Sequence, residues 1–587
     1  MDHRENHIRI IVCVLILLMS PGPAAAAWHQ DHFYVGGAAV GLGVGALGSP
    51  ESRSADSLRL RRLNDAGLDL IIPTDRPGEA DGIQLIQLMD AMRQPVNSTF
   101  RMKMILNRTI LHRPDAPVPE PPPGNTIGFN RDPRGNEVQI RQVLSPSGGL
   151  NTDSVEGWYY WDEAPQYPYF KTLDDGHVVV DHQTLPPGEA EGLMHAMTAM
   201  LRNPPPPNGS DLSEKLTFNN LLGMTPAAGP LYGPGCPPNT ALSPDAYRCY
   251  LDRVLSPYNN DPLPAPVLAY DNYIFEGDAS EAAANRQHFL RNLAAVRDKS
   301  MEYSRPSYRI PFWSFIQLSR RRRNIDFPPD AGPSFEQVRF QAFAALAFGA
   351  KGIFYWGVAP MLADTNDHHT PDYPEGILNA QGAISEPLYT AVTSLNSELH
   401  ALGPTLMKLD CIAAHLTSNP GGMLLPENDP LLSDSHRVYD VVTEATAASG
   451  APALVAYLKD HYNGDDYLFV VNANTAPGGA TSFTVRLGSG ASHIYRTDGI
   501  TGQQVLLSGA VAAGGTFSTP SIPPGGGVLL RLEDEYEEHI PRVNKLMTQG
   551  GRIYLALPGF VWLDSSMPRD PRRVEIEPAA VEVDRLA

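Results

Sequence analysis

Short apolar runs alternate with longer amphipathic stretches from residue 30 to residue 402. The short runs are rich in β-branched and aromatic residues and are bounded by glycine, proline or asparagine, which is typical of buried strands. They fall at 33–37, 68–73, 102–107, 157–161, 216–222, 267–273, 308–317 and 351–357. The stretches between them include 54–66, 81–93, 189–201, 281–303, 335–348 and 387–402. Eight parallel strands joined by helices predict an α/β fold of the (β/α)8 TIM-barrel type.

The pattern changes after residue 403, where only short strands separated by glycine- and asparagine-rich turns remain. Candidate strands fall at 438–442, 454–458, 466–472, 483–487 and 528–532, which predicts a small all-β sandwich. We therefore expect four parts: a leader over 1–27, a barrel over 28–403, a sandwich over 404–535 and a tail over 536–587. The tail is charged apart from one apolar piece, and its pattern predicts no particular structure.

The N-terminus has the pattern of a signal peptide. Residues 10–19 are uninterruptedly apolar but too few to span a bilayer, and small alanines at 24–27 offer a cleavage site. A retained anchor is the alternative. No later segment is long and apolar enough to cross a membrane, so we expect a secreted or periplasmic protein without a membrane partner.

The net charge of −20 disfavours nucleic acid and anionic membranes as partners. Gly43, Gly45 and Gly48 match the spacing of a dinucleotide fingerprint, but they lead into a loop at Pro50 instead of opening a helix. No cysteine and histidine set has the spacing of a zinc site. We therefore expect no cofactor and no metal.

The chain has four cysteines, of which Cys13 would leave with the leader. Cys236 and Cys249 flank a long proline-rich loop, and in an oxidising compartment we expect them to form a disulfide bond. Two free thiols are the alternative. Cys411 would then be an odd, buried thiol.

Polar and aromatic side chains follow the predicted barrel strands where each strand ends. The fourth strand ends in Asp162 and Glu163, which are costly to bury unless they have partners or a function. Comparable positions on the other strands hold Asn107, Asn220, Tyr270, Asp271, Tyr273, Trp313, Gln317 and Trp356. In a parallel barrel these positions converge on one face, where catalysis is built. Rings beside carboxylates and amides suit a sugar, which stacks on rings and bonds through its hydroxyls.

The sequence resembles the clan A glycoside hydrolases, in particular β-galactosidase-like (β/α)8 barrels with a C-terminal β-sandwich. The likeness covers roughly residues 30–535. It is carried by GWYYWDEA at 157–164, YDNY at 270–273, and the segment from RFQ at 339–341 to GAKGI at 349–353.

The resemblance implies roles for particular residues. The acid/base of that clan is a carboxylate at the end of strand four preceded by a polar residue, which matches Glu163 preceded by Asp162. The clan's nucleophile is a glutamate at the end of strand seven, where this chain has Gln317. An amide cannot form a glycosyl ester, so either the register of this strand is misassigned or another group is the nucleophile, and Asp271 is our first substitute. Glu336 is the second, although it can equally serve as an acid interacting with a helix dipole.

These features predict a secreted glycoside hydrolase that cleaves O-glycosidic bonds in an oligo- or polysaccharide with two carboxylates. The catalytic candidates are Glu163 and Asp271, and the other strand-end residues are assigned to substrate binding. Trp313 and Trp356 can equally be core residues. The rival hypothesis is a non-catalytic carbohydrate-binding protein on the same scaffold, which Gln317 supports. The sugar, the linkage and the oligomeric state stay open.

Overall fold

The computed structural model describes the chain in segments. These are residues 28–40, 50–73, 79–94, 98–107, 152–162, 170–172, 178–180, 215–223, 244–255, 266–275, 279–304, 309–319, 333–359, 361–362, 371–373, 376–379, 381–417, 441–533, 545–549 and 552–556. The predicted leader and Cys236 lie outside them, so export and the Cys236–Cys249 bridge stay predictions. The helix expected at 189–201 also lies outside. Among the described residues, no helix has the length and hydropathy to cross a bilayer.

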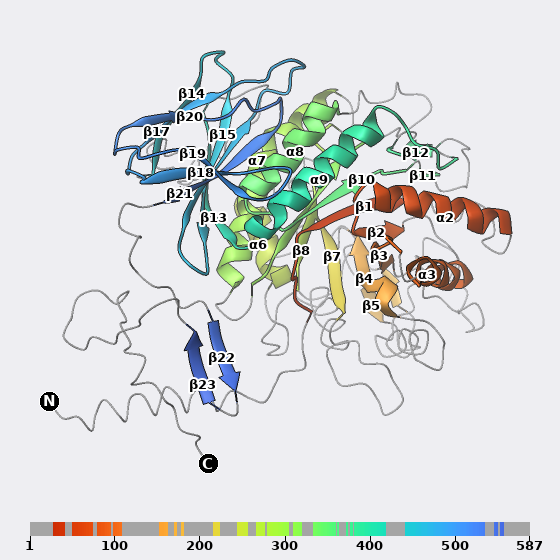
Figure 1. The fold of residues 1–587 in the computed structure, drawn as a ribbon. Helices are drawn as coiled ribbons and strands as arrows, with labels where there is room; N and C mark the ends of the chain where they lie inside the picture. The colour runs from red at the N-terminus through yellow and green to blue at the C-terminus, as the bar shows by residue number, and fades with distance from the viewer. Residues whose placement is uncertain are drawn as a thin grey trace.

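Eight parallel strands close into a barrel, which confirms the predicted TIM-barrel fold (Figure 1). The strands are β1 (Tyr34–Val40), β2 (Leu70–Pro73), β3 (Lys103–Asn107), β4 (Val155–Asp162), β7 (Leu216–Leu222), β8 (Leu268–Asp271), β9 (Phe312–Gln317) and β10 (Gly352–Trp356). Each barrel strand pairs in parallel with the next barrel strand, and β1 pairs with both β2 and β10. All strands therefore point their C-terminal ends toward the same opening.

Helices cover the outside of the barrel. They are α2 (Pro50–Asp65), α3 (Glu79–Arg93), α6 (Pro244–Leu255), α7 (Ala279–Tyr303), α8 (Phe335–Ala347) and α9 (Leu388–Leu406). Helix α8 begins at a capping box in which Ser334 and Gln337 satisfy each other's backbone N–H groups. It ends before Gly349, whose φ of 93° favours glycine. Short elements fill the connections: η3 (Thr152–Ser154), β5 (Phe170–Thr172), β6 (Val178–Val180), β11 (Met361–Leu362) and β12 (Pro371–Tyr373).

The barrel interior is filled by its own hydrophobic cluster, separate from the core between strands and helices. Trp313 stacks on Phe354 with ring centroids 4.8 Å apart. Two glycines make room for these rings, because a Cβ on Gly352 would lie 2.6 Å from the Trp313 ring and one on Gly36 would lie 2.2 Å from Phe354. The interior is thus a packed core and not a channel.

A two-sheet β-sandwich follows the barrel, as predicted (Figure 1). One sheet holds β13 (Leu409–Leu416), β15 (Ala453–Asp460), β16 (Asp466–Asn472), β21 (Gly527–Glu533), β18 (His493–Thr497) and β19 (Gln504–Ser508). The other holds β14 (Val442–Ala447), β17 (Phe483–Leu487) and β20 (Thr516–Ser518). Phe469 of β16 contacts Phe343 of α8, with ring centroids 5.9 Å apart, so the larger sheet packs directly on the barrel helices. In the tail, β22 (Lys545–Gln549) and β23 (Arg552–Ala556) pair as a hairpin.

Candidate active site

A buried carboxylate stands at the C-terminal opening of the barrel. Asp271 is the last residue of β8, and only 4% of its surface is exposed. Asn220 of β7, itself buried, donates from Nδ2 to Asp271 Oδ2 at 2.9 Å. The structure therefore brings together two of the predicted residues, and a neutral amide holds the carboxylate in a defined orientation.

Two aromatic rings lie at the same end of the barrel interior. Tyr273 and Trp356 have ring centroids 5.4 Å apart and planes inclined by 33°. Both pack partly buried against the interior cluster, beyond the layer that contains Phe315 and Phe354. Their position at the opening suits stacking on the apolar face of a pyranose.

Gln317 is the last residue of β9, the seventh barrel strand, as the sequence predicted. Its side chain is buried, accepts from the backbone N–H of Phe275 at 2.8 Å and donates to the carbonyl of Ser319 at 3.1 Å. Gln341 of α8 bonds both backbone groups of Gln317, at 3.0 and 3.1 Å. The amide thus ties together the loops that follow β8 and β9. Gln341 is the glutamine of the RFQ segment at 339–341, to which the sequence alone assigned no role.

The fourth strand ends at another predicted acid. Asp162 is the last residue of β4, and its backbone lies in register with Asn220 of β7. Asn107 ends β3 in register with Tyr159 of β4. Glu163 lies outside the described residues. The described register thus brings the end of β4 beside the strand that supports Asp271.

Two of the predicted substrate-binding residues are corrected by the structure. Tyr270 is fully enclosed in the core between strands and helices, where burial raises the pKa of its hydroxyl. Trp313 is fully enclosed inside the barrel, and its Nε1 donates to Gln30 Oε1 at 3.0 Å. Neither ring offers surface to a substrate, so both are core residues. Strand alternation is the signal that was missed, because it places Tyr270 on the opposite face from Asp271.

Glu336, the second substitute for the nucleophile, opens α8 where the sandwich meets the barrel. Its backbone carbonyl would lie 2.1 Å from a Cβ added to Gly525 of the sandwich. This position fits the role of an acid at a helix N-terminus better than that of a second catalytic carboxylate.

Asn272 follows Asp271 directly in the YDNY segment, and the sequence alone assigned it no specific role in the site. It is 3% exposed, and among the described residues neither atom of its side-chain amide has a hydrogen-bond partner. A buried amide without a partner is costly and suggests a ligand or water in the working protein. Among the described residues, no group of three or more acidic, histidine or cysteine side chains is arranged to hold a metal ion.

Comparisons with known proteins found structural likeness but no sequence relative. No protein-family model and no curated protein matches the chain. Solved structures similar to it include a β-galactosidase from Bacillus circulans sp. alkalophilus, at 10% identity and a TM-score of 0.44 over 85% of this chain and 99% of the other. A β-galactosidase from Rahnella sp. R3 matches at 10% identity and 0.44, over 85% and 98%. A glycoside hydrolase family 5 protein from Bacteroides vulgatus matches at 9% and 0.41, over 86% and 90%. The fold assignment rests on the strand order described above.

Proposed function

We propose that this protein is a glycoside hydrolase acting on an oligo- or polysaccharide at the C-terminal opening of its barrel. The observation that carries the proposal is Asp271, a buried carboxylate at the end of β8 that Asn220 orients. The Tyr273 and Trp356 rings at the same opening provide a surface for a sugar ring. A carboxylate, an amide and aromatic rings at one barrel opening form a combination suited to glycoside chemistry.

Glycoside hydrolysis requires a second carboxyl group across the scissile bond. We assign this role to Glu163, which directly follows β4, as the general acid that protonates the leaving oxygen. Asp271 then acts as the nucleophile or as the base that activates water. A carboxyl separation of about 5–5.5 Å corresponds to retention of anomeric configuration, and roughly 6.5–9.5 Å to inversion.

A carbohydrate-binding protein without hydrolysis is the second candidate, and Gln317 is the observation that favours it. Its side chain lies at the end of strand seven and hydrogen-bonds two backbone groups. An amide supplies no nucleophile for glycoside hydrolysis. Binding without turnover would leave Asp271 as a hydrogen-bond acceptor for sugar hydroxyls.

The leaving-group dependence of a Glu163→Gln variant distinguishes these candidates. General acid help is worth about 10²–10⁴-fold, and an activated phenol departs without it. The mature protein is first screened on a glycan panel and on nitrophenyl glycosides. Glu163→Gln should then cripple glycan cleavage and spare the bond-breaking step with the nitrophenyl glycoside of the same sugar. Equal losses on both substrates would remove Glu163 from the acid role, and binding without turnover of any wild-type substrate would favour the second candidate.

We place this activity outside the cytoplasm, on the strength of the predicted leader over residues 1–27. N-terminal sequencing of exported protein should begin at Trp28. A product that still carries Met1 would contradict export with cleavage.

A further inference from the structure

A pocket of about 580 Å³ lies at the opposite end of the barrel from Asp271. It is lined by the segments that precede β1, β9 and β10, by the start of β13, and by the turn after β15. Volumes of this order hold small organic ligands. Because the pocket is at the N-terminal ends of the strands, it is separate from the proposed active site.

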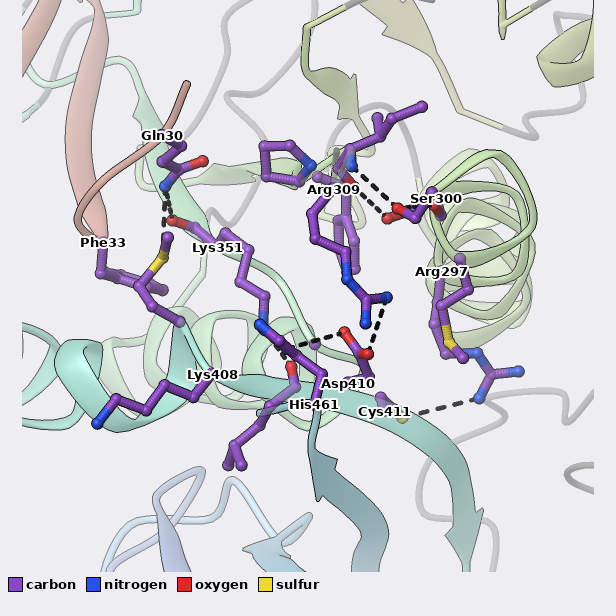
Figure 2. A pocket seen from close by; sticks show the side chains of 18 of the residues that line it. Gln30, Phe33, Arg297, Ser300, Arg309, Lys351, Lys408, Asp410, Cys411 and His461 are labelled. Carbon is purple, nitrogen blue, oxygen red and sulfur yellow. Dashed lines mark hydrogen bonds and ion pairs between the residues drawn. The ribbon is translucent and has the colours of Figure 1, made fainter. Parts of the chain in front are cut away.

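The wall of this pocket gathers positive charge in a protein whose net charge is −20. Arg309 and His461 approach Asp410 of β13, at 3.0 Å from Nη1 to Oδ2 and 3.7 Å from Nδ1 to Oδ1 (Figure 2). Lys351 points toward the same carboxylate in Figure 2, but its ammonium donates to the carbonyls of Leu406 and Leu409. One carboxylate therefore faces an arginine, a lysine and a histidine.

Donor capacity is left over for a ligand. The Arg309 side chain is 37% exposed, and a guanidinium has five N–H donors in a planar fork that matches a carboxylate. Within the described part of the chain, the hydrogen bonds of Lys351 go to backbone carbonyl oxygens, which carry no full charge. Burial lowers the pKa of Lys351 to about 8, an effect that an added anion would oppose.

Asp410 restricts which anions the pocket accepts. Burial alone would raise its pKa, but the nearby His461 ring and the charges of Lys351 and Arg309 hold that pKa below its ordinary value. A compact inorganic anion would meet an ionised carboxylate in the middle of the cationic cluster. A ligand with both an acidic group and hydroxyls could give its charge to Arg309 and donate its hydroxyls to Asp410.

An aromatic surface completes the pocket. Tyr462 lines it and is 78% exposed, an unusual state for a large ring. The ring of His461 lies 4.2 Å away, inclined by 49°. A ring with polar neighbours is a common platform for the apolar face of a sugar.

We propose that this pocket is a second ligand site, and that its ligand is an acidic saccharide with a carboxylate on the sugar ring. The acidic group pairs with Arg309 and Lys351, the hydroxyls reach Asp410, and the ring stacks on Tyr462. The proposal stands on the pocket alone and does not depend on hydrolysis at the barrel opening.

Isothermal titration calorimetry of the full mature protein with D-glucuronate, D-glucose and inorganic phosphate tests the proposal. Glucuronate should bind more tightly than either of the others, since it combines the charge of one with the hydroxyls of the other. Phosphate binding equal to glucuronate binding would overturn the sugar assignment. Absence of glucuronate binding at millimolar concentration would overturn the site.

Variants then locate the binding. Arg309→Gln should weaken glucuronate binding about tenfold or more, since charge-assisted bidentate bonds are the strong ones. Tyr462→Ala, at an exposed position where folding is not at stake, should weaken it severalfold. Arg486→Gln removes a half-exposed arginine paired with Glu444 at 3.1 Å and serves as the matched control without effect. Asp271→Asn should also leave glucuronate binding unchanged, so loss of hydrolysis and loss of this site are distinguishable. Binding that survives both Arg309→Gln and Tyr462→Ala would contradict the proposal.

Discussion

Two buried carboxylates at opposite ends of one barrel have different partners. Glu156, near the start of β4, accepts from Trp28 at 2.8 Å, Tyr34 at 2.8 Å and the Lys103 ammonium at 2.7 Å. Burial alone would raise its pKa, but these donors hold the pKa below its ordinary value. Asp271, at the end of β8, is held by the neutral amide of Asn220. The Lys103 ammonium neutralises the charge of Glu156, whereas the amide of Asn220 orients the carboxylate of Asp271.

The comparison predicts a large stability effect at the N-terminal end. Glu156→Gln should lower the free energy of unfolding by about 2–3 kcal/mol, because it leaves the Lys103 ammonium without its counter-charge. The loss stays in this range because the Lys103 side chain is partly exposed and water can hydrate it. Urea denaturation measures the change. Glu444→Gln, at an exposed ion pair with Arg486, is the matched control and should cost under about 1 kcal/mol. Equal losses of unfolding free energy at both positions would mean that the ion pair between Glu156 and Lys103 contributes little to stability.

A substitution at Gln317 tests the C-terminal end of the barrel. Gln317→Glu places a carboxylate at the end of strand seven, but an ionised carboxylate cannot donate to the Ser319 carbonyl. We expect a loss of about 1–3 kcal/mol in unfolding free energy and no gain in turnover. A variant with raised kcat and unchanged stability would show that strand seven, and not β8, holds the natural place of the nucleophile.

A third carboxylate, Glu398 of α9, lies where the helices meet the sandwich turn at Gly499. Burial raises its pKa to about 7 against the opposing charge of Arg339. A raised carboxyl pKa means that the folded state holds the proton more tightly, so stability falls as pH rises from about 4.5 to 7. Glu398→Gln should therefore stabilise the protein by roughly 1–2 kcal/mol at pH 8 and by little at pH 5. Thermal unfolding at the two pH values checks this, and a pH-independent difference would contradict it.

The sequence was sufficient for the fold because each barrel strand is a short apolar run with clear boundaries. It also predicted Asp271 and Gln317 as the ends of strands six and seven, which the structure confirms. The partners of these residues could not be predicted, because Asn220 and Asp271 are 51 residues apart and Glu156 and Trp28 are 128 apart. Contacts across such separations depend on barrel closure and not on any local pattern.

The two misassigned residues show a different limit. Tyr270 and Trp313 were assigned to the substrate because aromatic rings near acids suit sugars, but their positions along the strands decide otherwise. Tyr270 falls on the outward face of β8, and Trp313 falls near the start of β9 and not at its end. Residue type suggested a function that strand position excludes.

The turnover of an Asp271→Asn variant tests the central claim most directly. The change preserves size and leaves the β8 backbone in place while removing the charge. We expect kcat/KM on a cleaved glycan to fall by about 10³-fold or more, with unfolding close to that of the wild type. The matched control is Asp460→Asn, a buried aspartate of the sandwich that accepts from the backbone of Tyr462 and Asn463, and it should keep turnover within a few-fold. A folded Asp271→Asn protein with near wild-type turnover would contradict the account.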